Sequence, residues 1–331
     1  MEVVFTAEDM QFRYGMAATS ERVQREWLHA CTPGQDDEQP WFEREGEDYQ
    51  VGPGWKRDPS IEQKTRPEAL HLSVAAAFNH QQAIGVLRWF QRLRLINSAS
   101  LLEQAAGPHT ARLLSTDTYG DTIRALLCRL DFGIDDLKLA APDPRLRAAL
   151  DALFDERNAA PTTRRNILDS LPPRVVAMRS GVEFDLERDE SAGTVKAFEL
   201  AGPLVQTLAQ GDVIVIDEFD ARLHTLLAKQ LVELFQDPRT NPHDAQLVFA
   251  SHDTNLLTRT LLRRDQLWFV EKSRKTHASD LYSLAELRLE DGKGVRNDAR
   301  YEADYLQGKY GAIPFFGSLE AILADTAKSG D

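Results

Sequence analysis

The sequence predicts an α/β fold: a mostly parallel sheet with flanking helices, an N-terminal β-hairpin portion and an inserted helical lobe. VIVI at 213–216 is a continuous β-branched run, which is typical of a strand buried on both faces. A helical pattern follows at 223–235, and LVFA at 247–250 and LWFVEK at 267–272 read as a second and a third strand. Strand, helix and strand in this order indicate a βαβ unit, and therefore a parallel sheet.

The first 65 residues are expected to form an antiparallel β portion and a loop. EVVFTAEDMQFRYGMAAT, which begins at Glu2, has two apolar-aromatic runs separated by AEDM and predicts a β-hairpin. The polar, Gly- and Pro-rich stretch 31–59 favours a loop, with a short hairpin around 41–51.

Residues 66–172 are expected to form the helical lobe, because apolar residues recur there at spacings of three and four. The pattern returns to strand at 174–187. An amphipathic helix that contains Pro203 is then predicted at 191–210. We expect a core over 173–290 and a C-terminal tail over 291–331, all within one domain.

Composition limits the classes of partner. The chain has 331 residues, of which 42% are hydrophobic, so it can fill a large core. Its net charge of -13 opposes nonspecific attraction to nucleic acids and to anionic membranes. The basic cluster of Arg88, Arg92 and Arg94 is interpreted as an ordinary solvated helix face. Charge therefore does not indicate a nucleic-acid partner.

The cysteines and the N-terminus indicate the compartment. Cys31 and Cys128 are far apart and have no neighbouring cysteine or paired histidine, so neither a disulfide framework nor a zinc site is predicted. The first residues are acidic where a secretory signal would be basic. No apolar run approaches the length of a membrane helix. We expect a cytoplasmic protein with no membrane partner.

The segment GDVIVIDEFD, at 211–220, is the strongest candidate for chemistry. Its strand ends in Asp217 and Glu218, and parallel sheets bind their ligands at the carboxyl ends of strands. Asp217 can hold Mg²⁺, and Glu218 can polarise a water molecule. The alternative is that the two acids only make the end of the strand soluble and have no functional role. FASHD, one βαβ unit later, places His252 directly after the next strand.

The loop ESAGTVK, at 190–196, is a second candidate. It places Ser191 and Gly193 just before a helix. The free backbone amide groups of a helix N-terminus favour the binding of an anion, and a glycine lets the anion approach the backbone closely. Ser191 as a plain helix cap is the alternative.

These motifs resemble the bacterial AAA-type ATPase family with an ABC-like core that is linked to abortive infection and anti-phage defence. IDEFDARLH, at 216–224, is similar to the corresponding stretch of the structural-maintenance-of-chromosomes branch of ABC ATPases. ESAGTVK stands in the place of the ABC signature, although it departs from the usual Ser-Gly-Gly form. The resemblance extends through 65–80, through DFGIDDL at 131–137 and to the tail at 305–316.

The resemblance implies an ABC-type P-loop NTPase core that binds ATP and Mg²⁺. Asp217 would bind Mg²⁺, and Glu218 and His252 would be catalytic, with His252 at the γ-phosphate. Asp220 would contact the nucleotide, whereas Ser191 and Gly193 would serve the nucleotide of the opposite subunit. It therefore implies a homodimer with composite sites, and a separate effector subunit, a nuclease or toxin, as a further partner.

The phosphate-cradling loop G-x-x-x-x-G-K-[ST], the Walker A motif, does not occur in the 331 residues. We expect that an N-terminal segment carrying it is missing, and that this polypeptide binds ATP poorly and hydrolyses little of it. A noncatalytic pseudo-ATPase partner subunit is the second hypothesis. A nuclease or repair subunit is a third, but no clustered DxD or His-Asn-His pattern supports a cutting step.

Overall fold

The chain folds into two compact units, Met1–Arg94 and the part from Leu95 onward, and each is described by itself. The computed structural model describes residues 1–35, 37–97, 106–130, 132–157, 160–171, 173–289 and 292–313.

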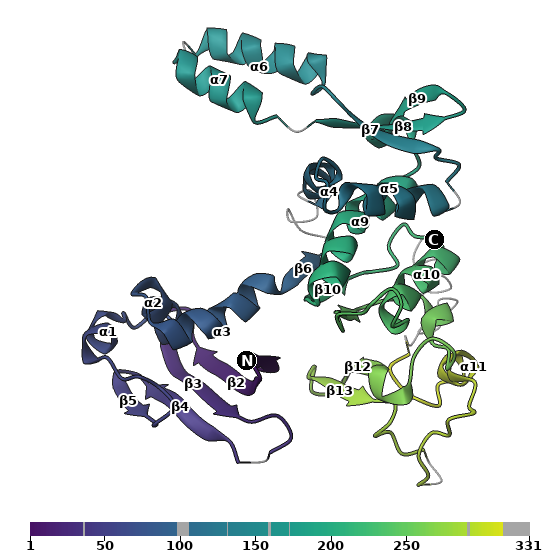
Figure 1. The fold of residues 1–331 in the computed structure, drawn as a ribbon. Coiled ribbons are helices and arrows are strands. Elements are labelled where there is room, and N and C mark those ends of the chain that lie inside the picture. The colour runs from purple at the N-terminus through teal and green to yellow at the C-terminus, as the bar shows by residue number, and fades with distance from the viewer. Residues whose placement is uncertain are drawn as a thin grey trace, which may run out of the picture. The chain divides into compact units, whose positions relative to one another are not determined.

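An antiparallel sheet forms the first unit, and its strands pair in chain order (Figure 1). They are β1 (Glu2–Ala7), β2 (Met10–Ala18), β3 (Val23–Cys31), β4 (Gln39–Glu45) and β5 (Asp48–Val51). The predicted hairpins are β1–β2 and β4–β5. Glu8 and Asp9 form the first turn with φ of 50° and 60°, the left-handed pair that suits the twist of a two-residue hairpin. β3 is a strand that the sequence reading missed.

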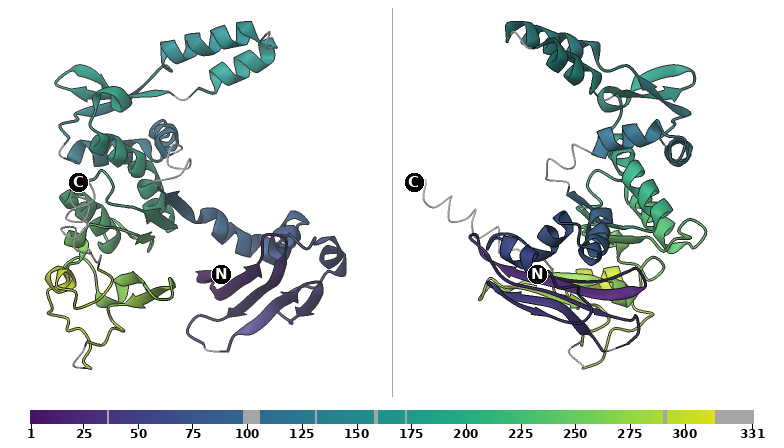
Figure 2. Two further views of the ribbon diagram at one scale, coloured as in Figure 1. Left: turned by 180° about the vertical axis from the view of Figure 1, so that it is seen from behind. Right: turned by 60° about the vertical axis from the view of Figure 1, so that its left-hand side comes forward.

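Three helices belong to the same unit: α1 (Pro59–Lys64), α2 (His71–Ala77) and α3 (Gln81–Arg92), shown from two sides in Figure 2. The sheet residues Phe12, Leu28 and Phe42 share one core with α2 and α3. Phe5 stacks on Trp89 of α3 with ring centroids 4.1 Å apart. α2 and α3 were expected in the helical lobe over 66–172, but their apolar faces pack on the antiparallel sheet instead. α1 lies in the portion over 1–65, where a loop was expected.

A buried carboxylate ties this sheet to α2. Glu26 of β3 is fully buried, and it accepts hydrogen bonds from the backbone N–H of His71 (2.6 Å) and of Leu72 (3.0 Å) at the helix N-terminus. The hydroxyl of Tyr14 is a third donor, at 3.0 Å, and the guanidinium of Arg44 lies 3.8 Å away. Because a buried charge requires such partners, the network fixes where α2 begins.

The long helix α9 (Ala192–Gln210) is the centre of the second unit, and α4 (Ala106–Leu114) and α5 (Gly120–Arg129) pack against it. Thr110 of α4 donates a hydrogen bond to the carbonyl of Glu199 (3.0 Å) and accepts one from the N–H of Gly202 (3.2 Å). This close approach explains why α9 has a glycine in its middle.

Three antiparallel strands adjoin this helical layer: β7 (Asp136–Ala140), β8 (Arg174–Arg179) and β9 (Val182–Asp185). Two further helices, α6 (Pro144–Glu156) and α7 (Pro161–Asp169), lie between β7 and β8 in the chain (Figure 1). Arg164 of α7 joins them through ion pairs to Asp151 and Asp155 of α6. The helices expected as one lobe are therefore divided among three settings.

The predicted βαβ unit is confirmed. β10 (Val213–Asp217) and β11 (Gln246–Phe249) pair in parallel, and α10 (Thr225–Gln236) connects them. β6 (Arg94–Asn97) flanks β10 on the other side. The prediction that VIVI is buried on both faces is wrong, however. Ile214 and Ile216 are fully buried, whereas Val213 and Val215, which alternate with them, are only half-buried. Val248 of the neighbouring β11 is 53% exposed.

The third predicted strand is present but does not join the parallel sheet. β12 (Trp268–Lys272) pairs antiparallel with β13 (Ser279–Ser283), the next segment along the chain. One face of this ribbon packs on α11 (Tyr301–Leu306), where Phe269 stacks on Tyr305. Only short 3-10 helices at 254–256 and 264–266 lie between β11 and β12. A parallel crossover from β11 to β12 would usually contain a longer helix. The antiparallel pairing of β12 with β13 needs only the short turn between them.

Two earlier expectations fall partly outside the described residues: DFGIDDL begins at Asp131, and the tail continues over 314–331. Among the helices of the described ranges, none has the length and apolar character needed to cross a membrane.

Candidate functional site

The carboxyl end of β10 carries the two acids that the sequence singles out. Asp217 ends the strand, and both Asp217 and Glu218 are exposed. Glu218 has φ of 50°, a left-handed conformation that costs a non-glycine residue about 1 kcal/mol or more. This left-handed residue follows the strand directly, and both carboxylates lie outside the core.

Phe219 anchors the segment after the strand. Its side chain is fully buried and packs on Phe249 of β11, with ring centroids 4.9 Å apart. Its backbone N–H donates to the carbonyl of Ala250 at 2.9 Å, which continues the pairing of the two strands past their last register pair. An apolar residue between acids thus fixes where the acids lie.

The loop after Phe219 is held by its own backbone. Ala221 N–H donates to the carbonyl of Glu218, and Leu223 N–H donates to the carbonyl of Asp220, both at 3.0 Å. Arg222 has φ of 65°, so this loop contains a second left-handed residue. We call residues 218–224 the acidic loop.

The segment after β11 lies beside the acidic loop. The side chain of His252 is exposed, and its backbone N–H donates to the Oδ1 atom of Asp220 at 3.1 Å. In the other direction, the hydroxyl of Thr225, the first residue of α10, donates to the Oδ2 atom of Asp253 at 2.6 Å. We call residues 250–256 the histidine loop. The structure therefore brings Asp217, Glu218, Asp220 and His252 to one edge of the sheet, as predicted.

Ser191 and Gly193 lie at the N-terminus of α9. Ser191 is the helix cap, and its Oγ atom accepts a hydrogen bond from Thr194 N–H at 3.2 Å. A methyl group on the Cα atom of Gly193 would lie 2.9 Å from the carbonyl oxygen of Arg222. Gly193 thus permits direct contact between this helix start and the acidic loop of the same chain.

The residue before this cap is anchored by an arginine. The side chain of Glu190 is 2% exposed and accepts a hydrogen bond from Nη2 of Arg179 at 2.8 Å. The same nitrogen donates to the carbonyl of Phe132 at 2.6 Å. The start of α9 is thereby fixed to β8.

Three residues that hold the site were not chosen from the sequence: Phe219, Thr225 and Asp253. Asp253 follows His252 in FASHD, and Phe219 stands between the acids in IDEFD, so both were visible as motif neighbours. Thr225 carried no signal, since its partner is 28 residues away in the chain.

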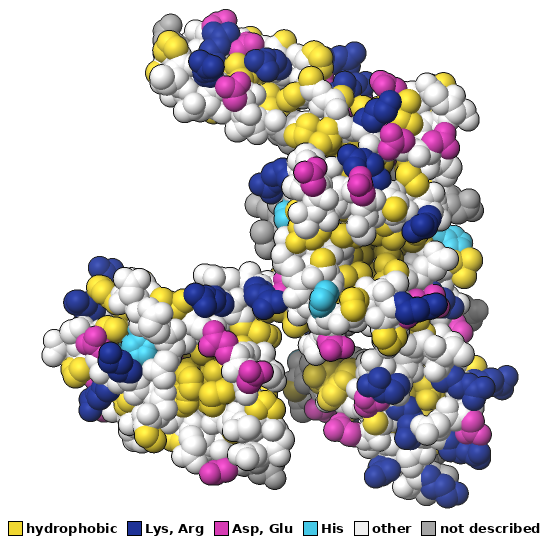
Figure 3. All heavy atoms as spheres, in the orientation of Figure 1, with side chains coloured by type: hydrophobic (Ala, Val, Ile, Leu, Met, Phe, Trp, Pro, Cys, Tyr) yellow, Lys and Arg dark blue, Asp and Glu magenta, His cyan; other side chains and the backbone are white. Residues whose placement is uncertain are grey.

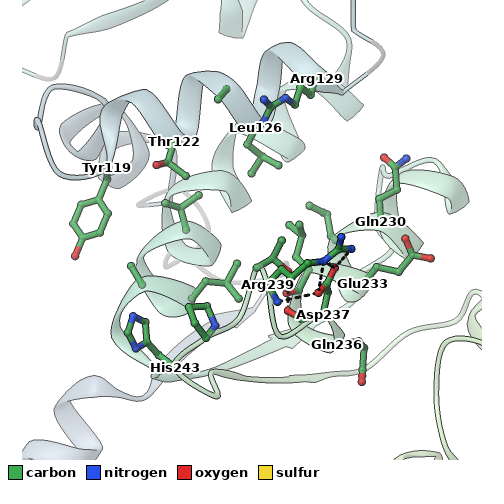
Figure 4. A pocket seen from close by; sticks show the side chains of 18 of the residues that line it. Tyr119, Thr122, Leu126, Arg129, Gln230, Glu233, Gln236, Asp237, Arg239 and His243 are labelled. Atoms are coloured by element: carbon green, nitrogen blue, oxygen red, sulfur yellow. Dashed lines mark hydrogen bonds and ion pairs between the residues drawn. The ribbon is translucent and has the colours of Figure 1, made fainter.

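A wide hollow lies elsewhere in the second unit, between α5, α9 and the end of α10 (Figures 3 and 4). It encloses about 960 Å³, and Leu126, Leu234 and His243 are among its lining residues. Its lining includes neither the acids of the acidic loop nor His252. It is therefore a separate feature from the candidate site.

Residues 133–258 match the model of a protein family described as "AAA domain, putative AbiEii toxin, Type IV TA system". The match confirms the resemblance to an AAA-type ATPase family of bacterial abortive infection, and its range includes every site residue named from the sequence. The chain matches none of the curated proteins. The family implies a nucleotide-binding, ATPase-like role.

Proposed function

We propose that this chain is an ATP-binding and ATP-hydrolysing subunit with an ABC-like core. The observation that carries the proposal is the arrangement at the sheet edge. Glu218 lies in a left-handed conformation directly after β10, and Asp220 of the same loop holds the backbone of His252. Sparsely populated backbone conformations cluster at functional sites, and this one lies at the edge of the sheet where parallel strands bind their ligands.

In this proposal, the carboxylate of Glu218 accepts a proton from the attacking water, and the ring of His252 donates a hydrogen bond to the γ-phosphate. Asp217 fits as a Mg²⁺ ligand, because it is an exposed carboxylate at a strand end, and Mg²⁺ needs only one or two carboxylates beside water and phosphate. No group of three metal-ligating side chains occurs in the described ranges, so the nucleotide would complete the coordination. Bound Mg²⁺ would neutralise phosphate charge.

The start of α9 supports a composite site. Ser191 and Gly193 would serve the nucleotide of a second copy, and the contact of Gly193 with Arg222 would join that surface to the acidic loop. The family description names a toxin of a type IV toxin–antitoxin system. From it we propose a setting in bacterial defence, with a separate effector.

A noncatalytic partner subunit is the second candidate. The specific observation in its favour is that no G-x-x-x-x-G-K-[ST] occurs in the 331 residues. Without the backbone amides and lysine of that loop, we expect weak ATP affinity for the chain by itself.

Phosphate release from Mg·ATP by the chain, together with ATP binding by calorimetry, tests both candidates. Glu218→Gln should lower turnover by about 10²- to 10⁴-fold and leave binding unchanged, because it removes the base alone. Glu233→Gln, an exposed acid on α10, is the matched control and should change neither. Measurable and equal turnover of wild type and E218Q would reject Glu218 as the base. Binding without any turnover would favour the noncatalytic subunit.

A further inference from the structure

Two hydrogen bonds connect the histidine loop to the segment formed by the acidic loop and the start of α10. The histidine loop is the donor in one of them and the acceptor in the other. Asp220 accepts from the backbone of His252, and Thr225 donates to the carboxylate of Asp253. Two neighbouring residues of the histidine loop are therefore held from the β10 side, one through its N–H and the next through its side chain.

The carboxylate of Asp253 is fully engaged. Its Oδ1 atom accepts from the N–H (3.0 Å) and the side-chain amide (2.8 Å) of Asn255, while Oδ2 takes the hydroxyl of Thr225. Burial raises the pKa of Asp253, but these hydrogen bonds outweigh it, so the pKa falls below its usual value. A hydrogen bond from a hydroxyl to a carboxylate is charge-assisted, and such hydrogen bonds are shorter and stronger than those between neutral groups.

The histidine loop is also held from its other side. The hydroxyl of Thr254 donates to Glu302 of α11 at 3.1 Å. The ring of His252 is nevertheless exposed. A fixed backbone beneath an exposed ring is a preorganised arrangement for a group that must meet a ligand.

We propose that Asp253 is a positioning residue for His252, and that its hydrogen bond with Thr225 fixes the histidine loop to the start of α10. The spacing between the ring of His252 and the carboxylate of Glu218 is then set by this link together with that of Asp220. The inference rests on the proposed function, because it assigns a task to His252 at the same site.

Thr225→Val tests the link, because it removes the hydroxyl and keeps the shape of the side chain. Thr225→Ser restores the hydroxyl. Thr240→Val is the matched control: Thr240 follows the other end of α10, and its hydroxyl donates to the carbonyl of Leu234 at 2.6 Å. All variants are compared in the full chain, with unfolding by urea to confirm that each is folded.

The first readout needs no ATP. Hydrogen exchange of the peptide spanning 250–256, measured by mass spectrometry, should accelerate about 5- to 30-fold in T225V, as expected when one such bond is lost. It should remain near wild type in T225S and T240V. Equal acceleration in T225V and T240V would overturn the inference, because the loss would then be general destabilisation.

The second readout is turnover of Mg·ATP. T225V should lower kcat by about 5- to 30-fold with little change in KM, and T225S should recover it. If E218Q lowers turnover but T225V does not, the positioning role is overturned and the proposed function stands. If E218Q has no effect, the proposed function fails, and with it the positioning role.

Discussion

Replacing Gly193 by alanine tests the contact that joins the start of α9 to the acidic loop. Gly193 is the second residue of α9, and a Cβ atom there would lie 2.9 Å from the carbonyl oxygen of Arg222. Carbon and oxygen atoms that are not bonded normally stay further apart, so one backbone segment would have to move by about 0.5 Å.

The expected free energy follows from two opposing effects. Alanine favours a helix over glycine by up to about 1 kcal/mol. Forcing an extra methyl group into a packed contact costs about 1–3 kcal/mol. Gly107 is the matched control, because it is the second residue of α4 and its added methyl would meet only the Cγ atom of Glu199, at 3.8 Å. G107A should therefore show the helix effect alone.

Urea-induced unfolding followed by circular dichroism measures both variants. We expect G193A to be less stable than G107A by about 1–3 kcal/mol, which is the cost of the contact. If G193A is stabilised as much as G107A, the start of α9 and the acidic loop are not in contact, and the reasoning is refuted.

Two further predictions concern the stability of each unit. Burial lowers the pKa of His71 to about 4 from 6.5, so the folded first unit takes up this proton only well below the pH at which the unfolded chain does. Its stability should be complete above pH 6.5 and fall by up to about 3 kcal/mol toward pH 4, as read by tryptophan fluorescence; His71→Phe should abolish this loss. In the second unit, Phe219→Ala should cost about 3–5 kcal/mol of unfolding free energy and Phe219→Leu much less. Equal costs in urea unfolding would show that Phe219 is not a packed anchor.

Much of the local structure follows from the sequence. The β10–α10–β11 unit, the hairpins of the first unit and the helix at 191–210 were predicted because their signals are periodic and local. The acids of 217–220 and His252 were placed at one sheet edge for the same reason, since parallel strands joined by one helix end on the same side.

The division of the helices and the pairing of β12 did not follow from the sequence. The apolar face of a helix indicates that another element must pack against it, but the sequence pattern does not indicate which element that is. The helices α2 and α3 pack on the antiparallel sheet, whereas α4 and α5 pack on α9. The strand signal at 267–272 likewise carries no information on its partner. The half-buried Val213 and Val215 of β10 show that a β-branched run need not be fully buried on both sides.

The sequence by itself determined which residues carry the candidate chemistry: Asp217 and Glu218 at a strand end, His252 after the next strand, and Ser191 and Gly193 before a helix. Only the tertiary structure decided what holds them. The contacts of Thr225 with Asp253 and of Gly193 with Arg222 each join residues about thirty positions apart. Such contacts depend on how strands and helices pack. A single contact between two distant residues produces no periodic pattern in the sequence.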